Sequence, residues 1–347
     1  MTPITTPDAP PLPPDAPDAP DADRRRWLAI AGASALGATL AACGGGGGGS
    51  AEAPASPSAP TPSPAPSPTP APSPAPAPAP APTPAPPPAS TVKRGLAYDL
   101  KDAADFSALA GGSVGWWVNW ALQPNATVVA QPSIAGAMEH VPMLWNFNFD
   151  TAQVVAALKA RPSVKSLLVL NEPNLVDQAN VTPASAAAQW PRYEEVARQT
   201  GVKIVGPAIT WGTMAGYTDP VAWMDAFIAA YRAANGGRDP QIDALAFHWY
   251  DYGLAGQLDR LTKYGKPFWI TEMANWHAQN DGAQIDTVAR QKAQMAEMVQ
   301  ICESRTDVVR YAWFTGRWSP DPHFTSLLGA SGALTELGQH YKSLPKG

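Results

Sequence analysis

Eight short apolar, β-rich runs alternate with segments of helical character from residue 94 onward. The runs cover residues 94–99, 114–120, 141–146, 166–171, 203–209, 244–250, 267–273 and 310–316. The helical segments cover residues 103–109, 152–161, 184–200, 221–235, 254–264, 284–304 and 334–344, and a further helix near residues 134–138 is only weakly marked. Near-continuous hydrophobic strands that alternate with helices predict a parallel sheet covered on both faces. Eight such units in about 250 residues predict an α/β fold of the (β/α)8, or TIM barrel, type.

A doubly wound open sheet is the alternative fold with the same alternation of strands and helices. Such sheets normally stop at about five to seven strands, and those that bind nucleotides carry a glycine-rich phosphate loop before the first helix. The sequence meets neither expectation, which favours the barrel. Residues 91–347 are also numerous enough to bury one sizeable core, so we expect them to form a single domain.

Residues 1–43 have the features of an export leader. Arginines at 24–26 precede an apolar run of 15 residues over 28–42, which fits a signal peptide and is short for a transmembrane helix. The letters LAAC at 40–43 resemble the lipobox of bacterial lipoproteins, which implies cleavage before Cys43 and a lipid on its thiol, and the paired arginines resemble a twin-arginine signal. We expect an exported, membrane-anchored lipoprotein in the periplasm or at the cell surface. The alternative is an uncleaved anchor helix.

Residues 44–90 are too biased in composition to build a core. Six glycines are followed by residues 51–90, in which 18 of 40 positions are proline, mainly alternating with Ala, Ser and Thr. This composition predicts a disordered, extended polyproline II stalk that spans about 120 Å at 3.1 Å per residue. We therefore expect the stalk to hold the domain away from its anchor.

The charge and the cysteines of residues 91–347 exclude some classes of protein. The 21 Lys and Arg residues against 23 Asp and Glu residues leave no basic excess for a nucleic acid. Cys302 is the only thiol of this part, so no disulfide can form within it, and the residue lies on the apolar side of a helical pattern. We expect Cys302 to be a buried hydrophobic residue and the domain to be a monomer without a cofactor.

Two glutamates follow apolar strands, at the end of the barrel where such enzymes keep their sites. Glu172 comes directly after the fourth run as part of Asn171-Glu172-Pro173, and Glu272 ends the seventh run after Thr271. An unpaired buried charge costs several kcal/mol, so two such carboxyl groups indicate paired chemistry. Across a barrel mouth they can lie about 5 to 5.5 Å apart, the spacing of a retaining glycosidase. Mutual repulsion would push their pKa values apart, leaving one acid and one nucleophile. The alternative is an ion-paired structural role.

These motifs resemble those of clan A glycoside hydrolases, and the compact domain with His248-Trp249-Tyr250 and Trp313-Phe314 is similar to the β-1,3-glucanase family called the glycosyl hydrolase catalytic core. The resemblance covers residues 94–347. It implies that Glu172 is the general acid/base, that Glu272 is the nucleophile, that Asn171 binds the sugar 2-hydroxyl and that Tyr250 orients Glu272. His248 is left open between support of its neighbours and direct contact with sugar.

Twelve of the thirteen tryptophans lie in the domain, and many of them follow strand ends. Pyranose faces are apolar and stack on aromatic rings, while amide side chains bond the hydroxyl groups. We expect a sugar cleft lined by Asn119, Trp120, Trp145, Asn146, Trp211, Trp276, Trp313 and Trp318. Of Trp116 and Trp117, at most one can face the barrel interior, because neighbouring strand residues point to opposite sides. Trp249 also lies at a strand end, whereas Trp190, Trp223 and Trp269 are interpreted as packing residues.

Together these features predict an enzyme that hydrolyses β-1,3-glucan internally with retention of configuration. No HExxH motif or closely spaced histidine pair is present, so we expect no catalytic metal. Two alternatives remain. One is another clan A β-glycanase that acts on β-1,4 linkages, and the other is a surface lipoprotein that binds carbohydrate without hydrolysing it.

Overall fold

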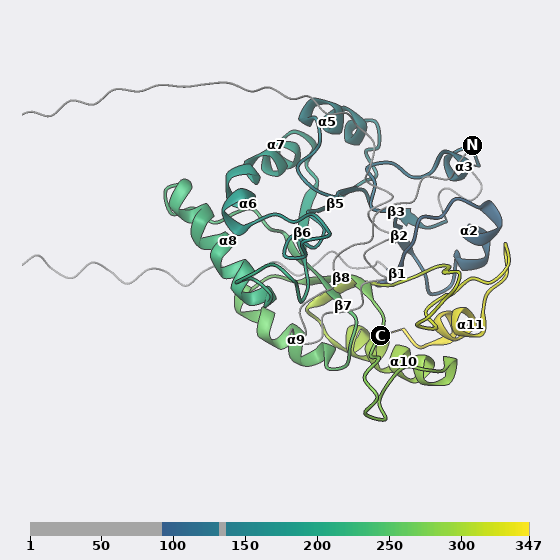
Figure 1. Ribbon diagram of the computed structural model, residues 1–347. Coiled ribbons are helices and arrows are strands. Elements are labelled where there is room, and N and C mark those ends of the chain that lie inside the picture. Colours follow the sequence, from purple (N-terminus) through teal and green to yellow (C-terminus); the bar gives the residue numbers. More distant parts are fainter. Residues whose placement is uncertain (1–91, 132–136, 347) are drawn as a thin grey trace, which may run out of the picture. The chain divides into compact units, whose positions relative to one another are not determined.

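The computed structural model describes residues 92–131 and 137–346 (Figure 1). The predicted signal segment, the lipidation site at Cys43 and the stalk at 44–90 lie outside the described residues and stay predictions. Among the residues that are described, no helix combines the length and the apolar character needed to cross a membrane.

A curled sheet of nine parallel strands forms the centre of the domain (Figure 1). The strands are β1 (Arg94–Ala97), β2 (Trp116–Val118), β3 (Glu139–His140), β4 (Met143–Leu144), β5 (Ser166–Val169), β6 (Lys203–Ile209), β7 (Ala244–Trp249), β8 (Phe268–Met273) and β9 (Val308–Trp313). Their order in the sheet is β3-β2-β1-β9-β8-β7-β6-β5-β4, and every pair is parallel. All carboxyl ends therefore lie along one rim.

The strand predicted at 141–146 is shortened to β4 in the structure, and a separate strand that was not predicted, β3, precedes it; the two form the edges of the sheet. β3 pairs with β2, and β4 pairs with β5. Only Val141 and Pro142 separate them in the chain, and Pro142 has no N–H to continue a ladder. Val141 donates its N–H to the Trp117 carbonyl, and Leu168 donates to the Pro142 carbonyl. Because the two edges are joined by this short segment, the curled sheet is consistent with a TIM-like barrel.

Helices cover the sheet on its outer side (Figure 1). They are α2 (Ala103–Leu109), α3 (Ala126–Val129), α5 (Thr151–Lys159), α6 (Pro183–Gln189), α7 (Pro191–Thr200), α8 (Pro220–Ala234), α9 (Leu254–Leu261), α10 (Val288–Ser304) and α11 (Glu336–Ser343), with a 3-10 turn, η2 (Thr262–Tyr264), after α9. Most begin at a residue whose side chain accepts a backbone N–H of the first turn, as Asp150 and Thr287 do. Such caps satisfy donors that the helix itself leaves free.

One predicted helix differs from the structure, and another lies mostly outside the described residues. The helix predicted at 184–200 is divided into α6 and α7 at Trp190 and Pro191. Proline lacks the donor for an interior turn and clashes with the preceding turn, so it starts a new helix instead of continuing the old one. Most of the helix expected near residues 134–138 falls on 132–136, outside the described residues, and the short α3 precedes it.

Buried aromatic side chains fill both sides of the sheet. The ring centroid of Trp116 lies 5.5 Å from that of Trp269 in β8. The ring of Trp117 instead packs edge-on against Phe106 of α2, with 6.0 Å between centroids. The two neighbours thus point to opposite sides of β2, as strand alternation requires. Trp190, Trp223 and Trp269 are buried, as predicted for packing residues. Cys302 is also fully buried, and burial raises the pKa of its thiol.

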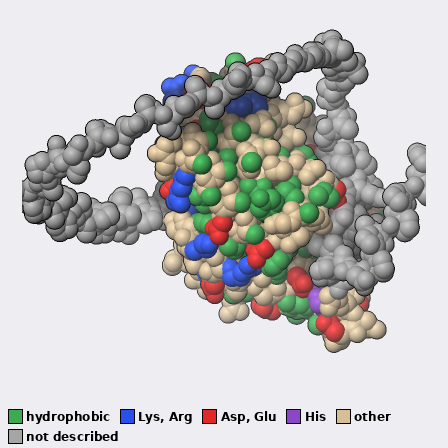
Figure 2. All heavy atoms as spheres, turned by 60° about the vertical axis from the view of Figure 1, so that its left-hand side comes forward, with side chains coloured by type: hydrophobic (Ala, Val, Ile, Leu, Met, Phe, Trp, Pro, Cys, Tyr) green, Lys and Arg blue, Asp and Glu red, His purple; other side chains and the backbone are tan. Residues whose placement is uncertain are grey.

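On the face shown in Figure 2, hydrophobic side chains gather near the centre, and basic side chains lie next to acidic ones at its lower left. Several ion pairs of the domain are exposed, such as Lys263 with Asp225 and Arg198 with Glu195. Exposed pairs contribute little to stability because water screens them. The buried aromatic core, and not surface charge, therefore dominates the stability of this fold.

A buried histidine supports the segment after β2. His140 ends β3 and is 8% exposed. Arg161 Nη2 lies 3.0 Å from His140 Nδ1 and must be the donor, because a guanidinium has no acceptor. The ring is therefore neutral and donates from Nε2 to Asn119 Oδ1 at 2.7 Å. Burial, together with the charge of Arg161, lowers the pKa of His140 to about 3.

Acid is expected to destabilise the fold through His140. Below its ordinary pKa of 6.5 the imidazole takes up a proton in the unfolded chain, but in the folded protein only near pH 3. Its contribution to stability is complete above pH 6.5 and is lost as the pH falls toward the folded pKa. When the pH falls from 7 to 5, the unfolding free energy of wild type should therefore decrease by about 2 kcal/mol more than that of His140→Gln. Urea denaturation measures this, and equal losses would contradict a neutral buried His140.

Candidate active site

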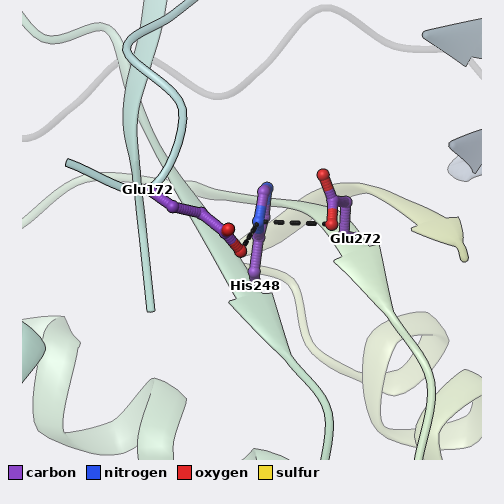
Figure 3. Close-up of side chains that lie close together, drawn as sticks. All are labelled: Glu172, His248 and Glu272. Atoms are coloured by element: carbon purple, nitrogen blue, oxygen red, sulfur yellow. Dashed lines mark hydrogen bonds and ion pairs between the residues drawn. The ribbon is translucent and has the colours of Figure 1, made fainter. Parts of the chain in front are cut away.

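Three buried side chains meet at the carboxyl ends of β5, β7 and β8 (Figure 3). Glu172 follows β5, His248 lies near the end of β7, and Glu272 lies in β8. Their exposed fractions are 0%, 1% and 1%. One oxygen of each glutamate and one ring nitrogen of His248 lie within 4.8 Å of one another. The rim of the sheet thus brings together the two glutamates that the sequence singled out, although a hundred positions separate them.

The imidazole of His248 lies between the two carboxyl groups (Figure 3). Its Nδ1 is 2.8 Å from Glu172 Oε1 and 3.5 Å from Glu272 Oε2. Its Nε2 is 2.8 Å from the hydroxyl oxygen of Thr271. Of the two roles left open by the sequence, the structure places His248 in contact with both glutamates and so in a supporting position.

Each oxygen of Glu272 accepts a hydrogen bond from a neutral aromatic donor. Trp120, which follows β2, donates its Nε1–H to Oε1 at 2.8 Å. Tyr250, which follows β7, donates its hydroxyl to Oε2. Two donors at fixed positions hold the carboxyl group in one orientation and stabilise its ionised form.

The backbone around these residues takes unusual conformations. Trp120, Leu170 and Glu172 have positive φ angles of 57°, 58° and 42°. Such conformations cost on the order of 1–3 kcal/mol each for residues other than glycine and gather at functional sites. Glu172 is held there by its N–H, which donates to the Ala208 carbonyl at 2.8 Å. The conformation turns the carboxyl group to the rim instead of continuing β5.

An aromatic wall adjoins Glu272 on the side of Tyr250. The ring of Trp276 packs on that of Tyr250, with 4.1 Å between ring centroids, and it lies nearly parallel to the His323 ring, with 4.8 Å between centroids. Trp318 contacts Trp276 at 5.4 Å, and Phe314 contacts Tyr250 at 5.8 Å. Trp276 and Trp318 therefore lie in the neighbourhood predicted for them. His323 had no predicted role, because nothing local in the sequence marks a ring that stacks from a distant loop.

A pocket of about 270 Å³ opens on the Trp120 side of the rim. Its lining includes Trp120, Trp145, Asn146, Asn148 and Phe149. Asn146 Oδ1 accepts the N–H of Asn148 at 2.8 Å. Aromatic faces with a few amide groups are the lining expected for a sugar ring. Three predicted sugar-binding residues, Trp120, Trp145 and Asn146, thus share one pocket, whereas Phe149 was missed because no strand-end pattern marks it.

Three other predicted sugar-binding residues contact protein groups of the scaffold. Trp313 has no exposed surface, and its Nε1–H donates to the Thr325 carbonyl. Trp211 packs against the Arg260 guanidinium at 5.4 Å. Asn119 is bonded to His140 as described above. The full burial of Trp313 corrects its predicted contact with sugar, whereas those of Trp211 and Asn119 stay predictions.

Asn171, predicted to bind the sugar 2-hydroxyl, is fully buried beside Glu172. Its Nδ2 lies 3.3 Å from Gln178 Oε1, and its Oδ1 has no hydrogen-bond partner among the described residues. Asn171 thus lies directly beside Glu172, and its role in binding the 2-hydroxyl stays a prediction.

The set of Glu172, His248 and Glu272 could also hold a metal ion, because its ligand atoms have suitable types and spacing. The same atoms, however, already face one another as hydrogen-bonding partners, and both rings that donate to Glu272 point at its oxygens. This arrangement suits one carboxyl group that gives and takes a proton beside another that its two donors keep ionised.

A second histidine joins the two loops behind the aromatic wall. His277 Nδ1 is 3.1 Å from Asp251 Oδ1, and its Nε2 is 3.1 Å from Asp281 Oδ2. A neutral imidazole has one N–H, so only the protonated ring can donate to both carboxylates. Burial opposes this charge, but the hydrogen bonds and charges of Asp281 and Asp251 outweigh it and raise the pKa of His277. The bridge ties the loop after β8 to the loop after β7.

Residues 95–341 match the sequence model of the family described as "Glycosyl hydrolase catalytic core". The chain is similar to the crystal structure of a GH128 (subgroup II) endo-β-1,3-glucanase from Pseudomonas viridiflava, with 60% identity, coverage of 74% of this chain and 99% of that one, and a TM-score of 0.72. A GH128 (subgroup II) endo-β-1,3-glucanase from Sorangium cellulosum is 33% identical, with coverage of 73% and 99% and a TM-score of 0.60.

A curated relative is Alkali-sensitive linkage protein 1 of Schizosaccharomyces pombe, which is 26% identical over 266 residues. The match covers 72% of this chain but spans only 44% of the length of that relative. The shared part is thus less than half of the yeast protein.

The His277 bridge gives stability a second, opposite dependence on pH. Its contribution is fully present below pH 6.5, the ordinary pKa of histidine, and is lost as the pH rises through the raised pKa of the folded protein. The stability difference between wild type and His277→Gln should therefore be larger at pH 6 than at pH 9. Urea denaturation at the two pH values measures it. A difference that does not change with pH would show that no protonated ring bridges the loops.

Proposed function

The chain belongs to the glycosyl hydrolase catalytic core family and is a glycoside hydrolase, and we propose that it cleaves β-1,3-glucan internally with retention of configuration. The observation that carries this proposal is the pair of buried carboxyl groups at Glu172 and Glu272, joined by His248 within 4.8 Å. The substrate is proposed from the similarity to endo-β-1,3-glucanases, one of them 60% identical.

In the first step, Glu172 acts as the general acid. It gives its proton to the glycosidic oxygen while the bond from that oxygen to the anomeric carbon breaks. The ionised Glu272 attacks the anomeric carbon from the opposite face and forms a covalent glycosyl-enzyme. The released part of the glucan leaves with the proton as a free hydroxyl group.

In the second step, water releases the sugar from Glu272. The carboxylate of Glu172 takes a proton from the water, whose oxygen bonds to the anomeric carbon while the ester bond to Glu272 breaks. Two inversions at the same carbon give net retention. Glu172 is again protonated and Glu272 is again ionised, so the enzyme returns to its starting state.

The surroundings of the two glutamates support these roles. Glu272 receives N–H and O–H donors from Trp120 and Tyr250, which favour its ionised form. Glu172 faces Nδ1 of the His248 ring. This nitrogen can act as acceptor or as donor, because the Thr271 hydroxyl next to Nε2 can donate or accept in turn. His248 can thus accept from the protonated acid and donate to the carboxylate that it becomes.

The spacing of the carboxyl groups supports retention over inversion. One carboxylate oxygen of Glu172 and one of Glu272 lie within 4.8 Å of each other. Inverting enzymes need about 6.5–9.5 Å between the groups to leave room for a water molecule, whereas retaining enzymes need about 5–5.5 Å. The short separation leaves space for an anomeric carbon but not for a water molecule placed between acid and base.

Glu272→Gln should reduce the hydrolysis of laminarin to background, because the amide cannot form the glycosyl-enzyme. The matched control is Glu336→Gln on α11, which makes the same chemical change at an exposed residue paired with Lys292 and should keep wild-type activity. Products from laminarin, curdlan, mannan and carboxymethylcellulose, resolved by size, test the linkage and the mode of cleavage. A ladder of oligosaccharides from laminarin supports internal cleavage, and activity on β-1,4-glucan alone would favour the alternative glycanase.

Glu172→Ala should lose activity in proportion to the need for a proton on the leaving group. With an unactivated glucan we expect a loss of about 10²–10⁴-fold, the usual contribution of general acid catalysis. An aryl glycoside whose phenol leaves readily should form the glycosyl-enzyme at close to the wild-type rate, seen as a burst of phenol. An equal loss on both substrates would contradict the role of Glu172 as the acid.

A further inference from the structure

Trp120 contacts both the proposed nucleophile and the neighbouring pocket. Its Nε1–H donates to Glu272 Oε1 at 2.8 Å, while the same side chain lines the pocket that also contains Trp145 and Asn146. Tyr250, the other donor to Glu272, is not among the residues that line this pocket. Of the two donors, Trp120 is thus the one that a ligand in the pocket can touch.

The backbone of Trp120 is held in a conformation that the residue by itself disfavours. Its φ of 57° is rare for a bulky side chain. The flanking residues are fixed on both sides: Asn119 Oδ1 accepts the Ala121 N–H at 3.3 Å, and the Ala121 carbonyl accepts the Met143 N–H at 3.0 Å. Asn119 is itself bonded to the neutral ring of His140. A network without sugar contact therefore sets the direction of the indole.

The ring of Trp120 is supported by a residue that it shares with the other donor. Phe314 lies 6.0 Å from Trp120 and 5.8 Å from Tyr250, and it meets both rings edge-on, at interplanar angles of 63° and 79°. Movement of Trp120 would therefore disturb the packing of both groups that hold Glu272.

We propose that Trp120 is a positioning residue for Glu272 and that it links the orientation of this carboxylate to a glucosyl unit bound in the adjoining pocket. The inference rests on the proposed function, since it takes Glu272 as the nucleophile and a β-glucan as the ligand. The indole N–H fixes the rotation of the carboxylate, and a sugar stacked on the ring restrains the indole. Trp120 thus acts on the reaction through Glu272 and not only by binding sugar.

The test compares Trp120→Phe with Trp145→Phe, using laminarin as substrate. Both changes remove an indole N–H and reduce the ring area at the same pocket, but only Trp120 donates a hydrogen bond to Glu272. Loss of a hydrogen bond to a charged group predicts a fall in kcat of about 10- to 100-fold for Trp120→Phe with a small change in KM. For Trp145→Phe we expect a raised KM and a kcat within about twofold of wild type. A Trp120→Phe enzyme with unchanged kcat and raised KM would overturn the proposal.

A second readout separates positioning from a merely structural role. The acid limb of the kcat/KM profile should move to higher pH in Trp120→Phe, because a carboxylate that loses a donor is harder to ionise. An unmoved limb would count against the proposal. If Trp120→Phe does not fold, Asn119→Ala tests the same network without altering the indole, and unchanged kcat in this folded variant would also overturn it.

Failure of this inference is distinguishable from failure of the proposed function. Wild type that does not hydrolyse laminarin, or that is matched by Glu272→Gln, would refute the function itself. An active wild type and an inactive Glu272→Gln, together with unchanged kcat and an unmoved acid limb in Trp120→Phe, would refute only the role of Trp120.

Discussion

The structure depends on the burial of two carboxyl groups at one rim of a parallel sheet. Taking an ionised carboxylate out of water costs several kcal/mol unless hydrogen bonds or opposite charge compensate. Here His248 lies between Glu172 and Glu272, while Trp120 and Tyr250 donate to the latter. These contacts offset the cost of burying the pair and hold it in the arrangement that the proposed acid and nucleophilic roles require.

The groups that compensate come from different strands, so the sheet must hold them in register. β7 and β8 are neighbours, and β5 is separated from β7 only by β6. The positive φ angles of Trp120 and Glu172 oppose stability locally, and the packed aromatic core on both sides of the sheet offsets them. The two histidines away from the site, His140 and His277, add dependences on pH of opposite sign, because one is buried neutral and the other is held between carboxylates.

Much of this arrangement could be predicted from the sequence. A glutamate directly after an apolar run is a local pattern, and the parallel order of strands then requires Glu172 and Glu272 to lie at the same rim. Two corrections come from single prolines: Pro142 lies between β3 and β4, and Pro191 separates α6 from α7, because proline lacks the N–H that would continue a ladder or a helix. The other corrections concern features that are not local. Trp313 also lies at a strand end, but the loop that returns through Thr325 covers it.

The sequence by itself determined the alternation of strands and helices, the family and the identity of the two carboxyl groups, because apolar periodicity and strand-end motifs are properties of neighbouring residues. Only the tertiary structure decided which aromatic and amide side chains reach the site. That choice depends on the left-handed backbone at Trp120, on the bond between Asn119 and His140, and on packing between distant loops. The direction of a side chain at a strand end is set by such contacts, and residues far apart in the chain provide them.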